Sequence, residues 1–176
     1  MSSTRALAIC CLVWLVGGVL GGCPGARADD CDLASTAAIA QAKVPHAITH
    51  VMIAPGQSPV RAEMILTATT AYSQIDGAWH AVPFSAQQQI DMITAATQRT
   101  QQTPHTCQKV GNQQINGEAA SLLIMRTEAN GKVTEARMWI SDRTSLPLRS
   151  EIHLDNGTVV TDDFRYDNIA PPPDVK

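Results

Sequence analysis

The side chains best suited to chemistry are histidines and aspartates, and their spacing argues against a metal site. His46 and His50 are four residues apart, but the alternating pattern around them predicts a strand. On a strand the two side chains share a face and stand about 13 Å apart, too far to hold one metal ion together. The carboxylates Asp162, Asp163 and Asp167 match no calcium loop, and alternation divides them between two faces, as on a solvated sheet edge.

Motifs of known catalytic centres are absent from the sequence. It contains no Gly-x-Ser-x-Gly elbow, no His-Glu-x-x-His, no Walker loop and no dinucleotide fingerprint. We therefore expect a protein that is not an enzyme and that uses no cofactor and no metal. An enzyme with an acidic site that includes Asp162 and Asp163 is a further alternative.

The N-terminus has the layout of a secretory signal peptide. Arg5 precedes an apolar run over residues 6–20, and small residues then lead to Ala26-Arg27-Ala28. The apolar run is shorter than the roughly 20 residues that a membrane-spanning helix needs. We expect residues 1–28 to be removed and the mature protein to be periplasmic and not transmembrane.

Cysteine parity supports export into an oxidising compartment. Removal of the first 28 residues leaves Cys31 and Cys107, an even pair that we expect to form a disulfide. A second route stays open, because the segment 20–23, LGGC, resembles a bacterial lipobox. Cys23 would then carry a lipid, and the protein would be a membrane-anchored lipoprotein. Pro24 directly after this cysteine is unusual for a lipobox, which favours the soluble form.

Size and charge indicate a single domain that does not bind nucleic acid. Residues 29–170 are long enough for one hydrophobic core, and residues 171–176 form a Pro-rich C-terminal tail. Loss of Arg5 and Arg27 leaves 11 basic residues against 16 acidic ones, a net charge of -5. That balance disfavours a polyanionic partner.

Two helices are predicted from capping residues and from the helical spacing of apolar residues. Asp32 is a candidate N-cap of the first helix, which Pro45 ends. Ser85 begins the second helix, where Ser-x-x-Gln resembles a capping box. The expected buried stripes are Leu33, Ala37, Ala40 and Val44 in the first helix, and Ala86, Ile90, Ile93 and Thr97 in the second.

Strands are predicted wherever apolar and polar residues alternate. Four strands fall within residues 46–82, and the others follow within residues 106–169, separated by Asn-Gly pairs typical of tight hairpins. In the long stretch 133–155, Arg149 and Glu151 share an exposed face, as expected for cross-strand salt bridges. The prolines at 171–173 predict a tail that cannot join the sheet. About nine antiparallel strands and two helices give an α+β fold.

The order of these elements and three short segments resemble the bacterial lipoprotein-localisation superfamily, in particular its secreted, outer-membrane lipoprotein-sorting-like members. The segments are RMWIS at 137–141, LPLRSE at 146–151 and FRYDNI at 164–169. The resemblance implies a curved antiparallel half-barrel with two helices covering its concave face, above an apolar space that holds acyl chains in the carriers. The chain has two helical segments where carriers have an additional lid helix, so no lid residue is carried over.

Several apolar side chains are candidates for lining this space: Met52, Met64, Ile90, Met92, Ile93, Met125, Met138 and Ile140. Methionine suits adaptable apolar surfaces. One hypothesis is a periplasmic carrier that accommodates lipid acyl chains or a lipidated protein between helices and sheet. The other is a half-barrel with an ordinary filled core, acting as an envelope structural or protein-interaction module. Lipid that copurifies with the protein would favour the first.

Overall fold

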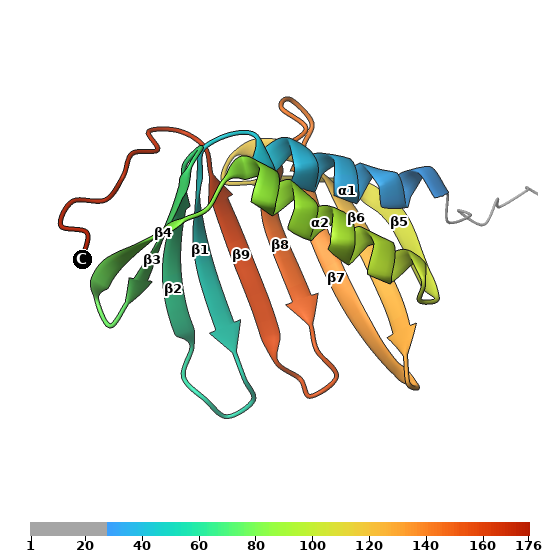
Figure 1. The fold of residues 1–176 in the computed structure, drawn as a ribbon. Coiled ribbons are helices and arrows are strands. Elements are labelled where there is room, and N and C mark those ends of the chain that lie inside the picture. The colour runs from blue at the N-terminus through green and yellow to red at the C-terminus, as the bar shows by residue number, and fades with distance from the viewer. Residues whose placement is uncertain (1–27) are drawn as a thin grey trace, which may run out of the picture.

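A computed structural model describes residues 28–176 of the chain. The expected signal peptide, apart from its last residue, and Cys23 lie outside these residues. The fold is one curved antiparallel sheet with two helices lying across its concave side (Figure 1). This is the α+β half-barrel predicted from the sequence, and the sheet is not closed into a barrel.

Eleven elements follow one another along the chain. They are α1 (Ala28–Ala42), β1 (His46–Ile53), β2 (Val60–Leu66), β3 (Thr70–Ile75), β4 (Ala78–Pro83), α2 (Ala86–Gln101), β5 (His105–Ile115), β6 (Glu118–Ala129), β7 (Lys132–Ser141), β8 (Pro147–His153) and β9 (Val159–Arg165). The number of strands and the place of each helix agree with the sequence prediction.

The sheet consists of two sets of hairpins joined in the middle. Its strand order is β4-β3-β2-β1-β9-β8-β7-β6-β5, so the first strand pairs with the last. The other neighbouring pairs in the described chain are consecutive strands. Two of the predicted hairpin turns have the backbone angles of a tight turn, because φ is positive at both residues of Asn116-Gly117 and of Asn130-Gly131.

The two helices differ from their expected buried stripes. Helix α1 begins at Ala28, so Asp32 lies within the helix and is not its cap. Its buried residues are Ala34, Ala37, Gln41 and Ala42, whereas Leu33 and Ala40 are half-buried and Val44 is exposed beyond the helix end. Small side chains therefore face the sheet, which lets α1 lie close to it.

Helix α2 begins with the predicted capping box. The Ser85 Oγ accepts a hydrogen bond from the Gln88 N–H at 3.2 Å, and the Gln88 Oε1 accepts one from the Ser85 N–H at 2.7 Å. The expected stripe of this helix, residues 86, 90, 93 and 97, is only half-buried. The stripe is only half-buried because α2 packs mainly on α1 and stands away from the sheet.

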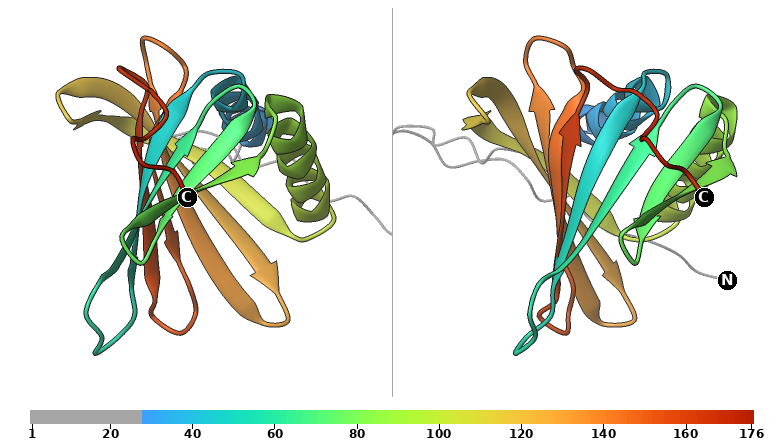
Figure 2. Two further views of the ribbon diagram at one scale, coloured as in Figure 1. Left: turned by 60° about the vertical axis from the view of Figure 1, so that its left-hand side comes forward. Right: turned by 90° about the vertical axis from the view of Figure 1, so that its left-hand side faces the viewer.

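Both faces of the sheet carry buried apolar residues. Leu123, with no exposed surface, alternates with Leu122 along β6, so the two side chains point to opposite faces. Leu122 belongs to a cluster on the convex face with Ile115, Ala120, Trp139 and Leu148. Seen from the side, the turn end of the β5–β6 hairpin projects on the side away from the helices (Figure 2).

The C-terminal tail joins the sheet, contrary to the prediction. Val175 forms an isolated parallel bridge with Trp79 of β4, and the Lys176 N–H donates to the Trp79 carbonyl at 2.8 Å. The tail runs from the end of β9 past β3 to reach this edge (Figure 1). The prolines themselves take no part in this bridge.

Candidate functional site

A cavity of about 350 Å³ lies between the two helices and strands β5 to β7. Its wall combines residues of all five elements: Cys31, Asp32, Ala34, Ser35 and Ala38 of α1; Ile93, Ala96, Thr97, Thr100 and Gln101 of α2; and His105, Cys107, Met125, Thr127, Thr134, Ala136 and Met138 of the strands. Aliphatic side chains and methyl groups make up most of this surface, and a few polar groups complete it.

The cavity exists because the side chains that face it are short. The helices contribute alanine, serine and threonine at most positions, and Ala136 lies on the strand floor between Met125 and Met138. A helix layer above a sheet leaves a gap that only large side chains can fill. With 4% aromatic residues in the whole sequence, the chain has few such side chains.

The predicted disulfide is present and forms part of the cavity wall. Cys31 of α1 and Cys107 of β5 are bonded, with their Cα atoms 5.2 Å apart. Near this bond the Asp30 carboxylate accepts a hydrogen bond from the Lys109 N–H at 2.9 Å. These two links fix the N-terminal half of α1 to the edge of the sheet.

The cavity brings together three of the eight candidate residues, Ile93, Met125 and Met138. Ile140 shares a face with Met138 but lies deeper, at 3% exposure. Met52 and Met64 lie on the same face of β1 and β2, outside this cavity. Ile90 is half-buried one turn before Ile93, and Met92 is 62% exposed. The alanines and threonines of the wall were not predicted, because their only signal in the sequence is their small size.

Beside the cavity, three polar side chains form a hydrogen-bonded group on the concave face. The His50 Nδ1 lies 2.7 Å from one carboxylate oxygen of Asp162, and the Ser150 Oγ lies 3.3 Å from the other. The expectation of a solvated edge is wrong for Asp162 and Asp163, because β9 is the central strand of the sheet, whereas Asp167 lies exposed beyond the end of β9. Alternation does divide them as expected, so Asp163 faces the convex side and pairs with Arg149 at 2.6 Å.

Charged pairs cover the convex face from β6 to β9. Glu135 accepts hydrogen bonds from Arg126 and Arg137, both at 2.9 Å, and the Arg126 hydrogen bond lowers the pKa of the Glu135 carboxyl. Arg137 also reaches Glu151 at 3.4 Å. The cross-strand salt bridges expected for Arg149 and Glu151 are therefore present. Their exposure makes each a small contribution to stability.

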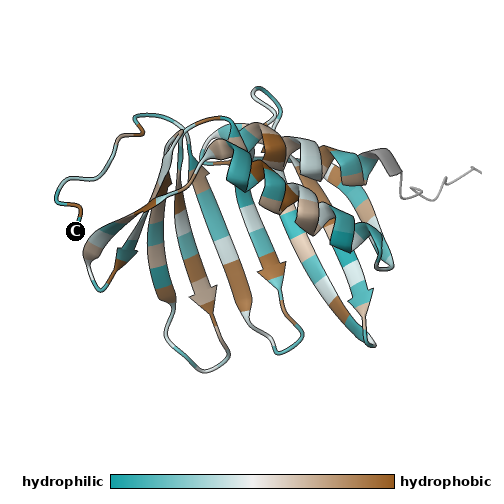
Figure 3. Ribbon diagram, in the orientation of Figure 1, coloured by the Kyte–Doolittle hydropathy of each residue, from teal (hydrophilic) through white to brown (hydrophobic). Residues whose placement is uncertain are grey.

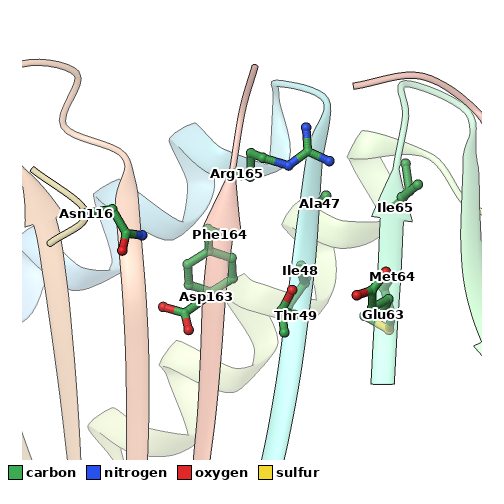
Figure 4. Close-up of a pocket in the computed structure, with 10 residues that line it drawn as sticks. All are labelled: Ala47, Ile48, Thr49, Glu63, Met64, Ile65, Asn116, Asp163, Phe164 and Arg165. Atoms are coloured by element: carbon green, nitrogen blue, oxygen red, sulfur yellow. The ribbon is translucent and has the colours of Figure 1, made fainter. Parts of the chain in front are cut away.

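A hollow of about 240 Å³ lies over β2, β1 and β9. Figure 4 shows Thr49, Glu63 and Asp163 around it, with Asn116 of the β5–β6 turn on the far side. Its carboxylates already have partners, because Arg61 binds Glu63 and Arg149 binds Asp163. The lining of the hollow is also less apolar than that of the cavity, so it offers a ligand less apolar contact.

Two features of residues 28–176 bear on other classes of function. No group of three or more metal-binding side chains comes together in this part of the chain. His46 and His50 share a face as predicted, and the His46 Nδ1 binds the Val44 carbonyl at 2.9 Å. Neither described helix is long and apolar enough to cross a membrane.

Comparison with known proteins shows a shared fold. No family model matches the sequence, and no curated protein matches it. The structure of Pseudomonas aeruginosa MucB bound to MucA superposes with a TM-score of 0.56 at 17% identity, over 84% of this chain and 60% of that chain. LprF of Mycobacterium bovis gives 0.49 at 14% identity, over 85% of this chain and 98% of that chain.

The matches also include a Nitrosomonas europaea protein named as a member of the LolA superfamily, with a TM-score of 0.31 at 10% identity, over 83% of this chain and 94% of that chain. The chain spans about 60% of the MucB chain. At these identities the comparison with MucB concerns the fold alone. The chain therefore has the curved half-barrel fold that was predicted from its sequence.

Proposed function

We propose that this protein is a non-catalytic binding protein of the bacterial envelope that holds an acyl chain between its helices and its sheet. The observation that carries this proposal is the apolar cavity of about 350 Å³. Small-molecule sites span roughly 300–1,000 Å³ and are lined mainly by apolar side chains with a few polar groups. The wall of the cavity has this composition.

The apolar wall of the cavity suits an alkyl chain better than a small polar ligand. Burial of each methylene contributes about 0.8 kcal/mol, so eight methylenes contribute roughly 6 kcal/mol before the cost of association. That cost begins at about 4 kcal/mol. Useful affinity therefore requires a preformed space, which the disulfide and the α1–β5 contacts supply.

Export is part of the same proposal. Residues 1–28 act as the signal peptide, and the disulfide is consistent with an oxidising compartment. Lipid attachment at Cys23 is the alternative form. Intact-mass measurement of the exported protein distinguishes the two, since a chain that starts at Asp29 excludes lipidation and a diacylglycerol adduct on Cys23 demonstrates it.

A second function, binding of an envelope protein, is favoured by one observation, the structure of MucB in complex with MucA. For this chain the two sheet edges are poor docking sites. Val175 occupies part of the β4 edge, and the β5 edge is interrupted by the bulge between Lys109 and Gly111. A protein partner would therefore bind a face of the sheet or the helices.

A matched pair of variants tests the acyl-chain site. Ala96 and its neighbour Ala95 are both exposed on α2, but only Ala96 contributes to the wall of the cavity. We expect Ala96→Trp to weaken binding of dodecanol at least tenfold in calorimetry, because the indole fills the space, and Ala95→Trp to leave binding unchanged. Equal binding by both variants and the unaltered protein would rule out this cavity as the acyl site.

A further inference from the structure

The group formed by Ser150, Asp162 and His50 lies beside the cavity on the concave face of the sheet. Cross-strand pairing joins Met138 to Ser150, Ser150 to Asp162, and Asp162 to His50. Met138 belongs to the cavity wall, so the three polar side chains continue its row across β8, β9 and β1. Adjacent strands are about 4.8 Å apart, which puts Asp162 roughly 10 Å from Met138.

Apolar residues flank this polar group along the strands. The neighbouring row of paired residues runs from Ala136 of the cavity wall through Ile152, Val160 and Met52 to Val60. In Figure 3 apolar colouring marks the ends of β1, β8 and β9 near their hairpin loops. A polar site within an apolar surface that continues a cavity fits an amphiphile better than a wholly apolar molecule.

The two neighbouring aspartates of β9 differ in how their charges are balanced. Asp163 is paired with a guanidinium, that of Arg149. Asp162 is hydrogen-bonded to a histidine and a hydroxyl, and neither carries the permanent positive charge of an arginine. Because a carboxylate only accepts hydrogen bonds, the His50 Nδ1 must donate to it. Each carboxylate oxygen keeps capacity for a further donor, since two oxygens offer about four acceptor positions.

We propose that Asp162, held by His50 and Ser150, binds the cationic head of a single-chain amphiphile whose alkyl chain occupies the cavity. This inference rests on the proposed acyl-chain site and adds the chemical class of its ligand, an alkylammonium compound. The arginines of the central strands do not compete for the carboxylate, because Arg137 and Arg149 have their ion-pair partners on the convex face.

The test compares three probes with the same twelve-carbon chain: dodecylamine, dodecanol and dodecanoate. All are titrated into the mature protein by calorimetry at pH 7, below their aggregation concentrations. An ion pair at about 4 Å is worth about 1 kcal/mol in water-like surroundings, which corresponds to about fivefold in affinity. We therefore expect dodecylamine to bind at least fivefold more tightly than dodecanol, and dodecanoate to bind least tightly.

Two variants with the same change in net charge distinguish an ion pair at Asp162 from an effect of the net charge of the protein. Asp162→Asn should abolish the preference for dodecylamine over dodecanol, and Asp163→Asn, on the opposite face, should keep this preference. Equal preference in the unaltered protein and both variants would overturn the headgroup site while leaving the cavity intact. Failure of all three probes to bind the unaltered protein would overturn the acyl-chain site, and the headgroup site with it.

Discussion

Loss of the Cys31–Cys107 disulfide should lower the free energy of unfolding by about 4.5 kcal/mol. The bond joins residues 76 apart in the sequence. In the chain-entropy description, closing a loop of this length removes about 15 cal/mol/K of conformational entropy from the unfolded chain, which gives about 4.5 kcal/mol at 25 °C. Domains of this kind are stable by only about 5–15 kcal/mol in total, so the reduced protein should be close to its stability limit.

Urea denaturation of three samples measures this effect. They are the oxidised protein, the same protein reduced with dithiothreitol, and the Cys31→Ala, Cys107→Ala double variant. Reduction keeps both sulfur atoms, so the oxidised-minus-reduced difference isolates the cross-link from the packing of buried Cys107. A difference below about 1 kcal/mol would refute the reasoning, since this link would then hardly constrain the unfolded chain.

Three further predictions concern single side chains. Burial lowers the pKa of the His46 imidazole, whose Nε2 has no partner, so the free energy of unfolding should be highest above pH 6.5 and fall by up to about 1.4 kcal/mol per pH unit below it. His46→Phe should remove this slope between pH 5.5 and 7.5 in urea titrations, and an unchanged slope would exclude His46 as its source. Ser85→Ala should cost about 1 kcal/mol and speed hydrogen exchange in the first turn of α2; unchanged exchange there would mean that the cap does not hold this end. Leu123→Ala should cost about 2–5 kcal/mol by thermal or urea denaturation, against less than about 0.5 kcal/mol for exposed Leu154→Ala, and similar losses would contradict the assigned core.

Local signals in the sequence predicted the elements of the fold. The capping box at Ser85 and the Asn-Gly pair at 116–117 depend on residues within one or two turns of chain, so they could be read directly. Alternation along β7 placed Met138 on the face of the sheet that later proved to form the cavity floor. The disulfide followed from the parity of the cysteines and not from any local pattern.

Features that depend on which strands become neighbours could not be predicted in this way. His50 and Asp162 are 112 residues apart, and only the pairing of β1 with β9 brings them into contact. The position of Asp162 was wrongly predicted for the same reason, because a strand pattern does not say whether the strand is central or at an edge. The alanine lining of the cavity was missed because small residues on a helix look the same whether they face a void or a close neighbour.

The pairing of β1 with β9 also constrains how the chain can fold. Strands β1 to β4 and strands β5 to β9 are each connected by short hairpins, which form early because their ends are close in sequence. The seam between these two halves requires a strand near the start of the domain to meet one near its end. The sheet therefore contains one pairing of long sequence separation, and a nascent chain cannot complete its sheet before β9 has been synthesised.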